Sequence, residues 1–354
     1  MERITFLSSG GSYANSSKRL AGGALATLAV LSACSGQGAS NPKPTKTTAT
    51  TSQFHPAQVG RNDITITVEG QQRTFIVNVP KSYESGHPMP VVMFFHGTNQ
   101  SAEYSWKASG WKEKGETEGI ITVFLTALKY NIPEDGGVVT KWNEGGVASK
   151  LKAGTRLYDD VGFVRTALEY LQSGWTVDPD RIFATGFSSG SGFVSNRLLM
   201  QMPDTFASFG VTPGTLSSDD ATVTPGPLTP QRSLYIVAGT NDGKAFGQPQ
   251  AKALRANFPK DPAVILADPY IKAIYGRWFP VLGLDPARYS IEQGQPDWQT
   301  LTFAKGAAGG TNDLRLRFVQ NMPHLYPGPA DAKDYGFANS DVFWAFFQAH
   351  PLGH

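Results

Sequence analysis

The chain has 354 residues, of which 40% are hydrophobic and 17% are charged, so it contains enough apolar material for a sizeable core. Its 38 glycines and 24 prolines exclude a coiled coil and a mainly helical bundle, because both residues interrupt helices. The net charge of +2 lacks the excess of positive charge that binding to a phosphate backbone needs, so we expect no nucleic-acid partner.

The only cysteine of the sequence is Cys34. One cysteine excludes an intramolecular disulfide, a CxxC redox pair and a thiolate cage for zinc. We expect no metal and no organic cofactor, and we expect the protein to be a monomer.

The first 34 residues resemble a targeting segment. Lys18 and Arg19 precede a short apolar run, residues 20–31, as in a secretory signal peptide. The run is too short and too rich in Gly and Ala for a membrane span. It leads into Leu-Ser-Ala-Cys at residues 31–34, which resembles the bacterial lipobox, whose cysteine is lipidated. We expect a secreted protein held at the cell surface or in the periplasm by a lipid on Cys34; an ordinary signal peptide with an incidental cysteine is the alternative.

Residues 35–60 are rich in Ser, Thr, Pro and Lys and contain almost nothing to bury, so they are expected to form a flexible tether. The folded body is expected at residues 61–354, as one domain. It starts with two alternating runs, residues 64–68 and 74–79, which predict an antiparallel hairpin around Gly70.

Short apolar runs and helical patterns then alternate along the chain. The apolar runs, bounded by Gly, Pro or Asp, are typical of strands buried on both faces of a parallel sheet; they are residues 91–95, 120–124, 182–185 and 234–238. Residues 160–171 and 192–200 have the spacing of amphipathic helices. This alternation predicts an α/β fold, a mostly parallel central sheet with helices on both faces.

A candidate nucleophile lies between one of these strands and a helix. Residues 186–190 read Gly-Phe-Ser-Ser-Gly, a G-x-S-x-G motif that would put Ser188 on a sharp strand-to-helix turn. Glycines are needed there because a Cβ would clash with the neighbouring backbone. A Gly/Ser turn that only caps a helix is the alternative.

A serine nucleophile needs a base, and His324 is the best placed histidine. It follows the alternating strand at residues 314–319 and lies in a turn-rich loop, where the base is found when the chain order is Ser, acid, His. The acid is expected at Asp242, just past the strand at residues 234–238, although Asp-Gly is also a common turn. Other aspartates precede His324 but follow no such strand: Asp261, Asp268, Asp285, Asp297 and Asp313.

Acyl transfer also needs N–H donors for the oxyanion. We expect them from the backbone of Ser189, the residue after the nucleophile, and of Thr98, in the loop after the strand at residues 91–95. His96 is interpreted as structural.

These motifs together resemble the polyhydroxybutyrate depolymerase/feruloyl esterase group of α/β-hydrolases. The resemblance covers most of the body and implies a secreted serine esterase with Ser188, Asp242 and His324 at the triad positions. The sequence departs from the usual pattern of this group at two positions without losing a predicted catalytic group. Thr98 stands where a Cys often follows His-Gly, and the helix after the serine turn lacks a Gly-Gly that is frequent at its start. The motifs that carry the resemblance are residues 96–100, 142–143, 159–163, 177–182, 186–190, 239–242 and 323–328.

The segment at residues 244–310 lies between acid and base and is rich in aromatic residues, so we expect an insertion that forms a cap or a substrate wall. Trp278 within it, and Trp142 in a Gly-rich loop, are predicted to contact substrate; a small satellite core is the alternative for the insertion.

The sequence thus predicts a Ser-His-Asp carboxylesterase that acts through an acyl-enzyme. Its expected substrates are feruloyl or acetyl esters of plant polysaccharide. A polyhydroxyalkanoate depolymerase is the first alternative, a non-catalytic envelope lipoprotein that binds a sugar or partner is the second, and a peptidase is disfavoured.

Overall fold

The computed structural model describes residues 58–213, 227–257, 266–295, 297–304 and 311–353, which all belong to one structural unit. Residues 1–57, with the expected signal peptide, Cys34 and nearly all of the expected tether, lie outside the described residues. Within the described ranges, no helix has both the length and the apolar character that crossing a bilayer requires.

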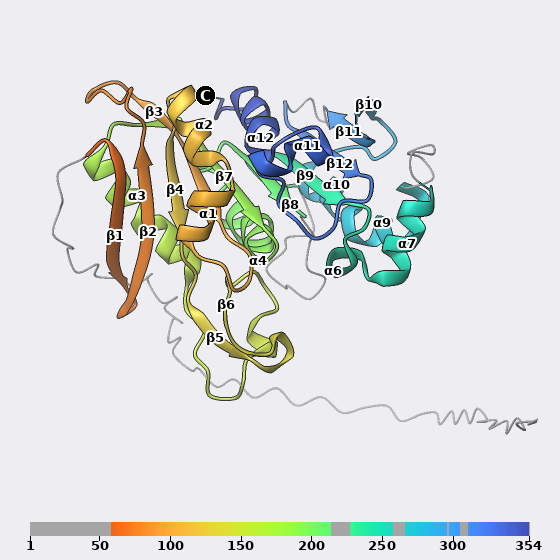
Figure 1. Ribbon diagram of the computed structural model, residues 1–354, viewed down its shortest axis with the longest axis horizontal. Coiled ribbons are helices and arrows are strands. Elements are labelled where there is room, and N and C mark those ends of the chain that lie inside the picture. The colour runs from red at the N-terminus through yellow and green to blue at the C-terminus, as the bar shows by residue number, and fades with distance from the viewer. Residues whose placement is uncertain (1–57, 214–226, 258–265, 296, 305–310, 354) are drawn as a thin grey trace, which may run out of the picture. The chain divides into compact units, whose positions relative to one another are not determined.

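One ten-stranded sheet runs through the unit in the order β1-β2-β4-β3-β7-β8-β9-β12-β11-β10 (Figure 1). Its middle pairs, from β4-β3 to β9-β12, are parallel, and the outer pairs are antiparallel. The strands are β1 (Gly60–Val68), β2 (Gln71–Val79), β3 (Met89–Phe95), β4 (Ile121–Leu125), β7 (Val177–Phe187), β8 (Ser208–Thr212), β9 (Ser233–Gly239), β10 (Ser290–Gly294), β11 (Trp298–Ala304) and β12 (Asp313–Val319).

Helices cover both faces of this sheet, as the alternating pattern predicts (Figure 1). Side chains of α3, α4, α9 and α10 pack on one face, and those of α2 and α12 pack on the other. The helices are α1 (Ala102–Ala108), α2 (Trp111–Glu118), α3 (Asp160–Gly174), α4 (Ser189–Phe193), a π-helical turn η3 (Val194–Leu198), α5 (Leu199–Gln201), α6 (Gly243–Phe246), α7 (Gln248–Asn257), α9 (Pro269–Tyr275), α10 (Trp278–Leu282), α11 (Ala332–Tyr335) and α12 (Asn339–Gln348).

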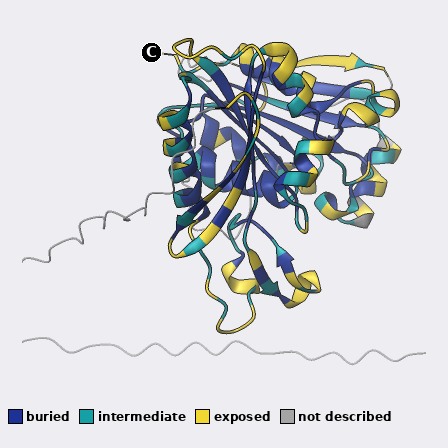
Figure 2. Cartoon of the chain, turned by 60° about the vertical axis from the view of Figure 1, so that its left-hand side comes forward, coloured by how far each residue is buried: buried dark blue, intermediate teal, exposed yellow. Residues whose placement is uncertain are grey.

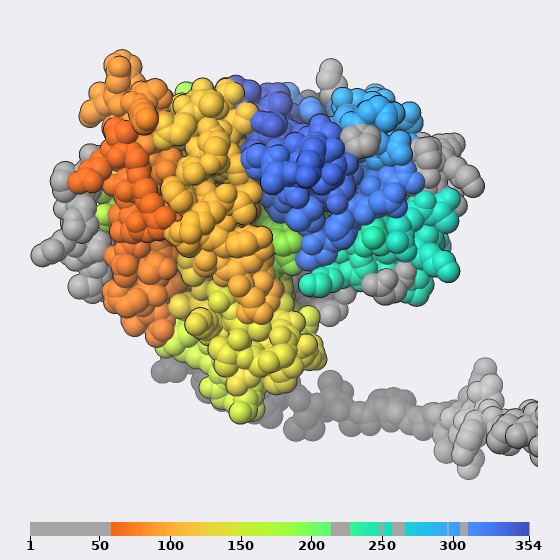
Figure 3. Space-filling model, viewed as in Figure 1, coloured from red at the N-terminus to blue at the C-terminus, as the bar shows by residue number. Residues whose placement is uncertain are grey.

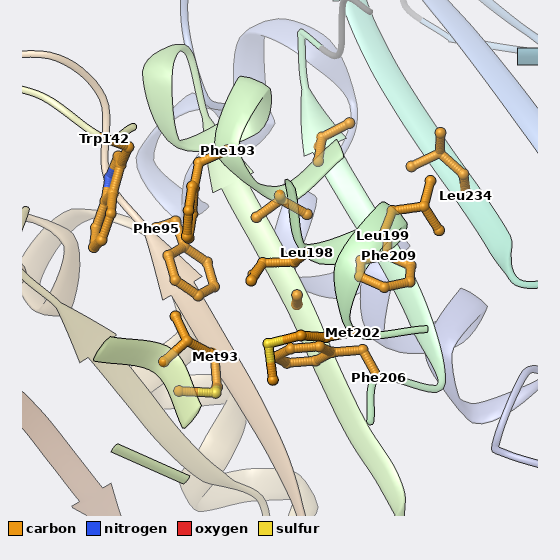
Figure 4. Packing of buried hydrophobic residues seen from close by; sticks show 14 of the residues in the cluster. Met93, Phe95, Trp142, Phe193, Leu198, Leu199, Met202, Phe206, Phe209 and Leu234 are labelled. Carbon is orange, nitrogen blue, oxygen red and sulfur yellow. The ribbon is translucent and has the colours of Figure 1, made fainter. Parts of the chain in front are cut away.

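Strand β3 shows why the central runs are continuously apolar. Met93 and Phe95 join the core on one face of the sheet, while Val92 and Phe94 join the core on the other face. Because side chains alternate along a strand, a sheet covered on both faces needs apolar residues at every position. The buried residues accordingly follow the central strands, and the exposed residues gather on outer helices and loops (Figure 2). Figure 4 shows Met93 and Phe95 packed among side chains of α4 and of the following turns.

Three elements differ from the sequence-based expectation. Strand β1 begins at Gly60, one residue earlier than the expected domain start. The helix expected at residues 192–200 begins at Ser189 and contains the π-helical turn η3. The last part of the expected cap consists of β10 and β11, which extend the sheet, because the alternating run of β11 pairs with β12.

A small excursion leaves the sheet after β4. It contains the antiparallel strands β5 (Lys129–Ile132) and β6 (Gly137–Thr140) and two short 3-10 helices, η1 (Pro133–Asp135) and η2 (Ala148–Lys150). Tyr130 and Val139 are among the buried residues of its own small core. The excursion extends as a bulge below β4 (Figure 3).

Candidate active site

Ser188 lies on a strained turn between β7 and α4. Its φ of 53° and ψ of −116° are unusual for a residue with a side chain, and such a conformation costs on the order of 1–3 kcal/mol. Both neighbouring glycines are required: a Cβ on Gly190 would lie 2.0 Å from the carbonyl oxygen of Phe95, and one on Gly186 would lie 2.5 Å from that of Gly190. The turn therefore has the backbone of a nucleophile elbow.

The structure brings Ser188, His324 and Asp242 together, as the sequence predicts. The His324 Nε2 atom lies 2.8 Å from the Ser188 Oγ, and the Nδ1 atom lies 2.8 Å from the Asp242 Oδ2. An Nδ1–H that donates to the carboxylate leaves Nε2 as the acceptor for the Ser188 hydroxyl proton. This is the tautomer that a general base needs.

Two local structures hold the base and the acid in place. Asp242 is 1% exposed and caps α6, because its Oδ1 atom accepts the backbone N–H groups of Lys244 and Ala245. The His324 ring lies in the loop after β12, with its centroid 5.0 Å from the Phe187 ring. Both groups are therefore oriented before any substrate arrives.

Two backbone N–H groups are free near the nucleophile. Thr98 and Ser189 line the same cavity as Ser188, and among the described residues no acceptor is assigned to either N–H. Ser189 opens α4, where the first N–H groups of a helix have no intrahelical acceptor. This arrangement fits the predicted oxyanion hole, which needs unpaired N–H groups beside the nucleophile.

A segment that begins at the last residue of β6 makes hydrogen bonds beside both of these donors. We call residues 140–144 the oxyanion strap. On one side, the backbone carbonyl of Thr140 accepts the N–H of Asn99, the neighbour of Thr98, at 2.9 Å. On the other side, the Trp142 N–H donates to the Ser189 Oγ at 3.2 Å. The strap thus holds the loop that contains Thr98 and the start of α4, which form the two sides of the predicted oxyanion hole.

The strap is itself anchored to a buried ion pair. The Asn143 N–H donates to the Asp160 Oδ2 at 2.7 Å, and the Asp160 Oδ1 accepts from the Arg73 guanidinium at 2.6 Å. Arg73 and Asp160 are each 1% exposed. At the far end of the strap, the Asn196 Nδ2 donates to the carbonyl of Glu144. Sequence reasoning placed Asp160 at the start of the helix expected at residues 160–171 and in the motif at residues 159–163, but it did not identify Arg73 as its partner.

Replacing Thr98 tests the oxyanion donor. Thr98→Pro removes one N–H, and we expect kcat on an activated ester to fall by roughly 10²–10³-fold with a smaller change in KM, because the donor acts mainly in the transition state. Thr98→Ala keeps the N–H and should retain kcat within a few-fold. Equal losses in both variants would mean that the Thr98 side chain, rather than its backbone, is required.

His96 is structural, as the sequence analysis expected. It is fully buried, its Nε2 atom accepts the Ala127 N–H at 3.0 Å, and its Nδ1 atom lies 2.7 Å from the Gly97 carbonyl. The neutral ring satisfies both partners only when Nδ1 carries the proton. Burial lowers the pKa of His96 to about 4.

This buried histidine predicts a loss of stability in acid. Between the unfolded pKa of about 6.5 and the folded pKa of about 4, the unfolded chain binds the extra proton. The contribution of His96 is therefore complete above pH 6.5 and decreases as the pH falls, by about 2 kcal/mol between pH 7.5 and pH 5. Urea unfolding at these two pH values should show this loss in the wild-type chain and a smaller loss in His96→Gln, which cannot titrate. Equal losses would contradict the prediction.

A cavity of about 720 Å³ opens above the triad, and its lining is mostly polar. Charged side chains of the β5-β6 excursion and of α6 form much of its wall; they are Asp135, Lys141, Glu144, Lys150 and Lys244. The Lys141 ammonium lies 2.9 Å from Asp135 and 3.3 Å from Glu144. Burial raises the pKa of Glu144 to about 7, although Lys141 opposes this shift. Sequence reasoning missed these charges; for Lys141 and Glu144, the available signal was their position beside Trp142 and Asn143.

A second, smaller cavity of about 270 Å³ meets the first at His324. Gln100, Phe187 and His324 line both cavities, and Tyr104, Tyr326 and other residues close the smaller one. The candidate nucleophile thus lies beside a polar space and a partly aromatic one.

The two predicted substrate-binding tryptophans do not line the cavity. The Trp142 ring is fully buried against Phe95 and Phe193 (Figure 4). Its Nε1 donates to the His96 carbonyl. Trp278, the first residue of α10, is fully buried in the core. Aromatic side chains fill cores as readily as clefts, so neither the aromatic density around Trp278 nor the loop position of Trp142 identified a substrate contact. Of the described part of the insertion at residues 244–310, Lys244 and Ala245 line the cavity.

Within the described residues, no group of three or more His, Cys, Asp or Glu side chains could hold a metal ion.

Comparisons with known proteins agree with this fold. No family model matches the sequence. NocK of Nocardia uniformis subsp. tsuyamanensis, which is named as an esterase, is 28% identical over 61% of this chain and 63% of its own length. Feruloyl esterase B of Piromyces equi is 28% identical over 48% of this chain and 29% of its own length. Poly(3-hydroxyalkanoate) depolymerase C of Paucimonas lemoignei is 27% identical over 36% of this chain and 28% of its own length. The chain thus spans less than two thirds of each relative.

Among solved structures, an acetyl xylan esterase from Aspergillus awamori superposes on 81% of this chain and 99% of its own, with a TM-score of 0.54 and 16% identity. At that identity the likeness concerns the fold. Together with the relatives named above, it confirms the resemblance that the sequence motifs predict. The chain has the α/β-hydrolase fold and is similar in sequence to ester hydrolases of the feruloyl esterase and polyhydroxyalkanoate depolymerase group.

Proposed function

We propose that this chain is a serine carboxylesterase. The observation that carries the proposal is the continuous chain of hydrogen bonds from Asp242 through His324 to Ser188. The free N–H groups of Thr98 and Ser189 beside the hydroxyl support it. Sequence similarity to esterases supports it independently.

The proposed mechanism follows from this geometry. His324 Nε2 takes the proton of Ser188 as the oxygen attacks the ester carbonyl, and Asp242 stabilises the imidazolium. The N–H groups of Thr98 and Ser189 receive the oxyanion of the tetrahedral intermediate. His324 then protonates the leaving alcohol, and a water molecule, activated by the same imidazole, cleaves the acyl-enzyme.

For the natural substrate we propose feruloyl or acetyl esters of plant polysaccharide. The similarity to a feruloyl esterase supports this choice, and so does the polar cavity, which suits a hydroxylated sugar better than a long apolar chain. Initial rates on methyl ferulate and acetylated xylan test the proposal. We expect kcat/KM on at least one of them to exceed that on 3-hydroxybutyrate oligomers by tenfold or more.

The similarity to a poly(3-hydroxyalkanoate) depolymerase favours a second candidate, hydrolysis of polyesters of hydroxy acids. The same comparison of rates decides between the two. A clear preference for hydroxybutyrate oligomers over both plant esters would replace the first candidate with this one.

We also propose that the mature protein is secreted and lipid-anchored through Cys34. The lipobox-like sequence supports this proposal. Cell fractionation tests it: wild-type protein should remain with the membranes, and Cys34→Ala should leave that fraction. Equal distribution of the two would argue for an ordinary signal peptide.

A further inference from the structure

The charges of the large cavity do not balance. Three of the five charged side chains in its lining are lysines, and two are carboxylates. Lys141 is only 10% exposed and lies between Asp135 and Glu144, so its charge is shared by both carboxylates. Lys150 and Lys244 are exposed, and neither takes part in an ion pair within the described residues. Among the described residues of the lining, the unmatched charge is therefore positive.

These two lysines reach the cavity from separate walls. Lys150 ends η2 in the β5-β6 excursion, and Lys244 lies in α6, next but one to Asp242 (Figure 1). Asp242 is not part of the lining: it is 1% exposed and lies behind His324, so the two lysines, and not the Asp242 carboxylate, face the cavity. The partial protonation of Glu144 near neutral pH reduces the negative charge of the wall further.

A cationic wall around a reacting ester affects the choice of substrate. Positive charge in a cleft raises the local concentration of anions and stabilises a bound carboxylate. The same positive charge neither concentrates nor stabilises a neutral ester of the same size. Lysine suits this task as a mobile point charge that does not require one fixed geometry.

We propose that the cavity above Ser188 selects esters that carry a carboxylate group, and that Lys150 and Lys244 are the residues that recognise it. This inference rests on the proposed esterase function and specifies its substrate class. Either the acyl part or the alcohol part of the ester can present the carboxylate, and the experiment distinguishes the two.

Two matched pairs of chromogenic esters test the proposal. 4-Nitrophenyl hexanoate and mono-4-nitrophenyl adipate differ by a carboxylate at the end of a six-carbon acyl chain. 4-Nitrophenyl acetate and 3-carboxy-4-nitrophenyl acetate differ by a carboxylate on the leaving group. We expect Lys150→Met/Lys244→Met to lower kcat/KM on the charged member of at least one pair by about tenfold, and to change the neutral member by less than twofold.

Two control variants sharpen the result. Lys152→Met removes an exposed lysine of the same segment that does not line the cavity, and it should leave both ratios unchanged. Glu144→Gln removes a negative charge from the wall and should raise the preference for the charged member. In the wild-type protein, raising the salt concentration from 0.02 M to 0.5 M should reduce that preference, since dissolved ions screen the electrostatic attraction between both lysines and the substrate carboxylate.

The possible outcomes distinguish a failure of the carboxylate inference from a failure of the proposed esterase function. If the protein hydrolyses neither member of either pair, the proposed esterase function fails. If it hydrolyses the neutral members and the double lysine variant leaves both charged-to-neutral ratios as in the wild type, the carboxylate inference alone is overturned.

Discussion

Ser188→Ala should abolish ester hydrolysis while leaving the protein folded. We expect kcat on 4-nitrophenyl butyrate to fall by roughly 10⁵-fold, because the acyl-enzyme cannot form without the hydroxyl. Rapid mixing of the wild-type protein with this ester should give a burst of nitrophenol that the variant lacks. Residual turnover within tenfold of the wild type would contradict the proposed role of Ser188.

The strained backbone at Ser188 supplies the control for this experiment. Alanine at φ 53° keeps the strain, so the urea midpoint of Ser188→Ala should match that of the wild type. Glycine adopts positive φ without cost, so Ser188→Gly should be equally inactive and more stable, by about 1 kcal/mol. A destabilised Ser188→Gly would mean that the elbow is not strained.

Arg73→Met should cause the largest loss of stability that we predict. It leaves the Asp160 carboxylate buried without its cation, and breaking a buried ion pair in this way typically costs about 3–5 kcal/mol. The substitution also removes a guanidinium that lies 3.9 Å above the Phe163 ring. Urea unfolding measures the effect. A loss below about 1 kcal/mol would mean that the pair contributes little.

Two double variants separate the stability of the pair from its role in positioning the oxyanion strap. Arg73→Met/Asp160→Asn removes both charges but keeps an oxygen that can accept the Asn143 N–H. Arg73→Met/Asp160→Leu removes both charges and the acceptor. Both should recover part of the lost stability, but only the Asn variant should keep kcat close to the wild-type value, with KM similar in the two. Equal kcat values would show that the contact with Asn143 does not position the oxyanion hole.

The sequence was sufficient to predict most strands of the sheet, although not β8, β10 or β11, and to select the three residues of the candidate triad. Each residue of the candidate triad follows the same local pattern. An apolar run that predicts a parallel strand ends, and the next residues form a loop or a helix at the carboxyl end of that strand. Ser188 follows β7, Asp242 follows β9 and His324 follows β12. Because these ends meet at one edge of the sheet, finding the strands was enough to place the side chains near one another.

The walls of the cavity could not be predicted in the same way. Trp278 was predicted from the aromatic density of the insertion and Trp142 from its Gly-rich loop, but a buried indole and a substrate-binding one look alike in a sequence. The partners Arg73 and Asp160 are 87 residues apart, and no pattern in the sequence pairs them. Lys150 and Lys244 meet one cavity only because the β5-β6 excursion folds back beside the elbow, and that depends on tertiary packing.

Covalent labelling with diisopropyl fluorophosphate is the most direct test of the proposed triad. Attack by the Ser188 oxygen on phosphorus would release fluoride and leave one diisopropylphosphoryl group on the protein. Mass spectrometry of the intact chain and its peptides should find this single addition at Ser188, formed much more slowly in His324→Ala and absent in Ser188→Ala. An unlabelled wild-type protein, or a label on another residue, would contradict the account.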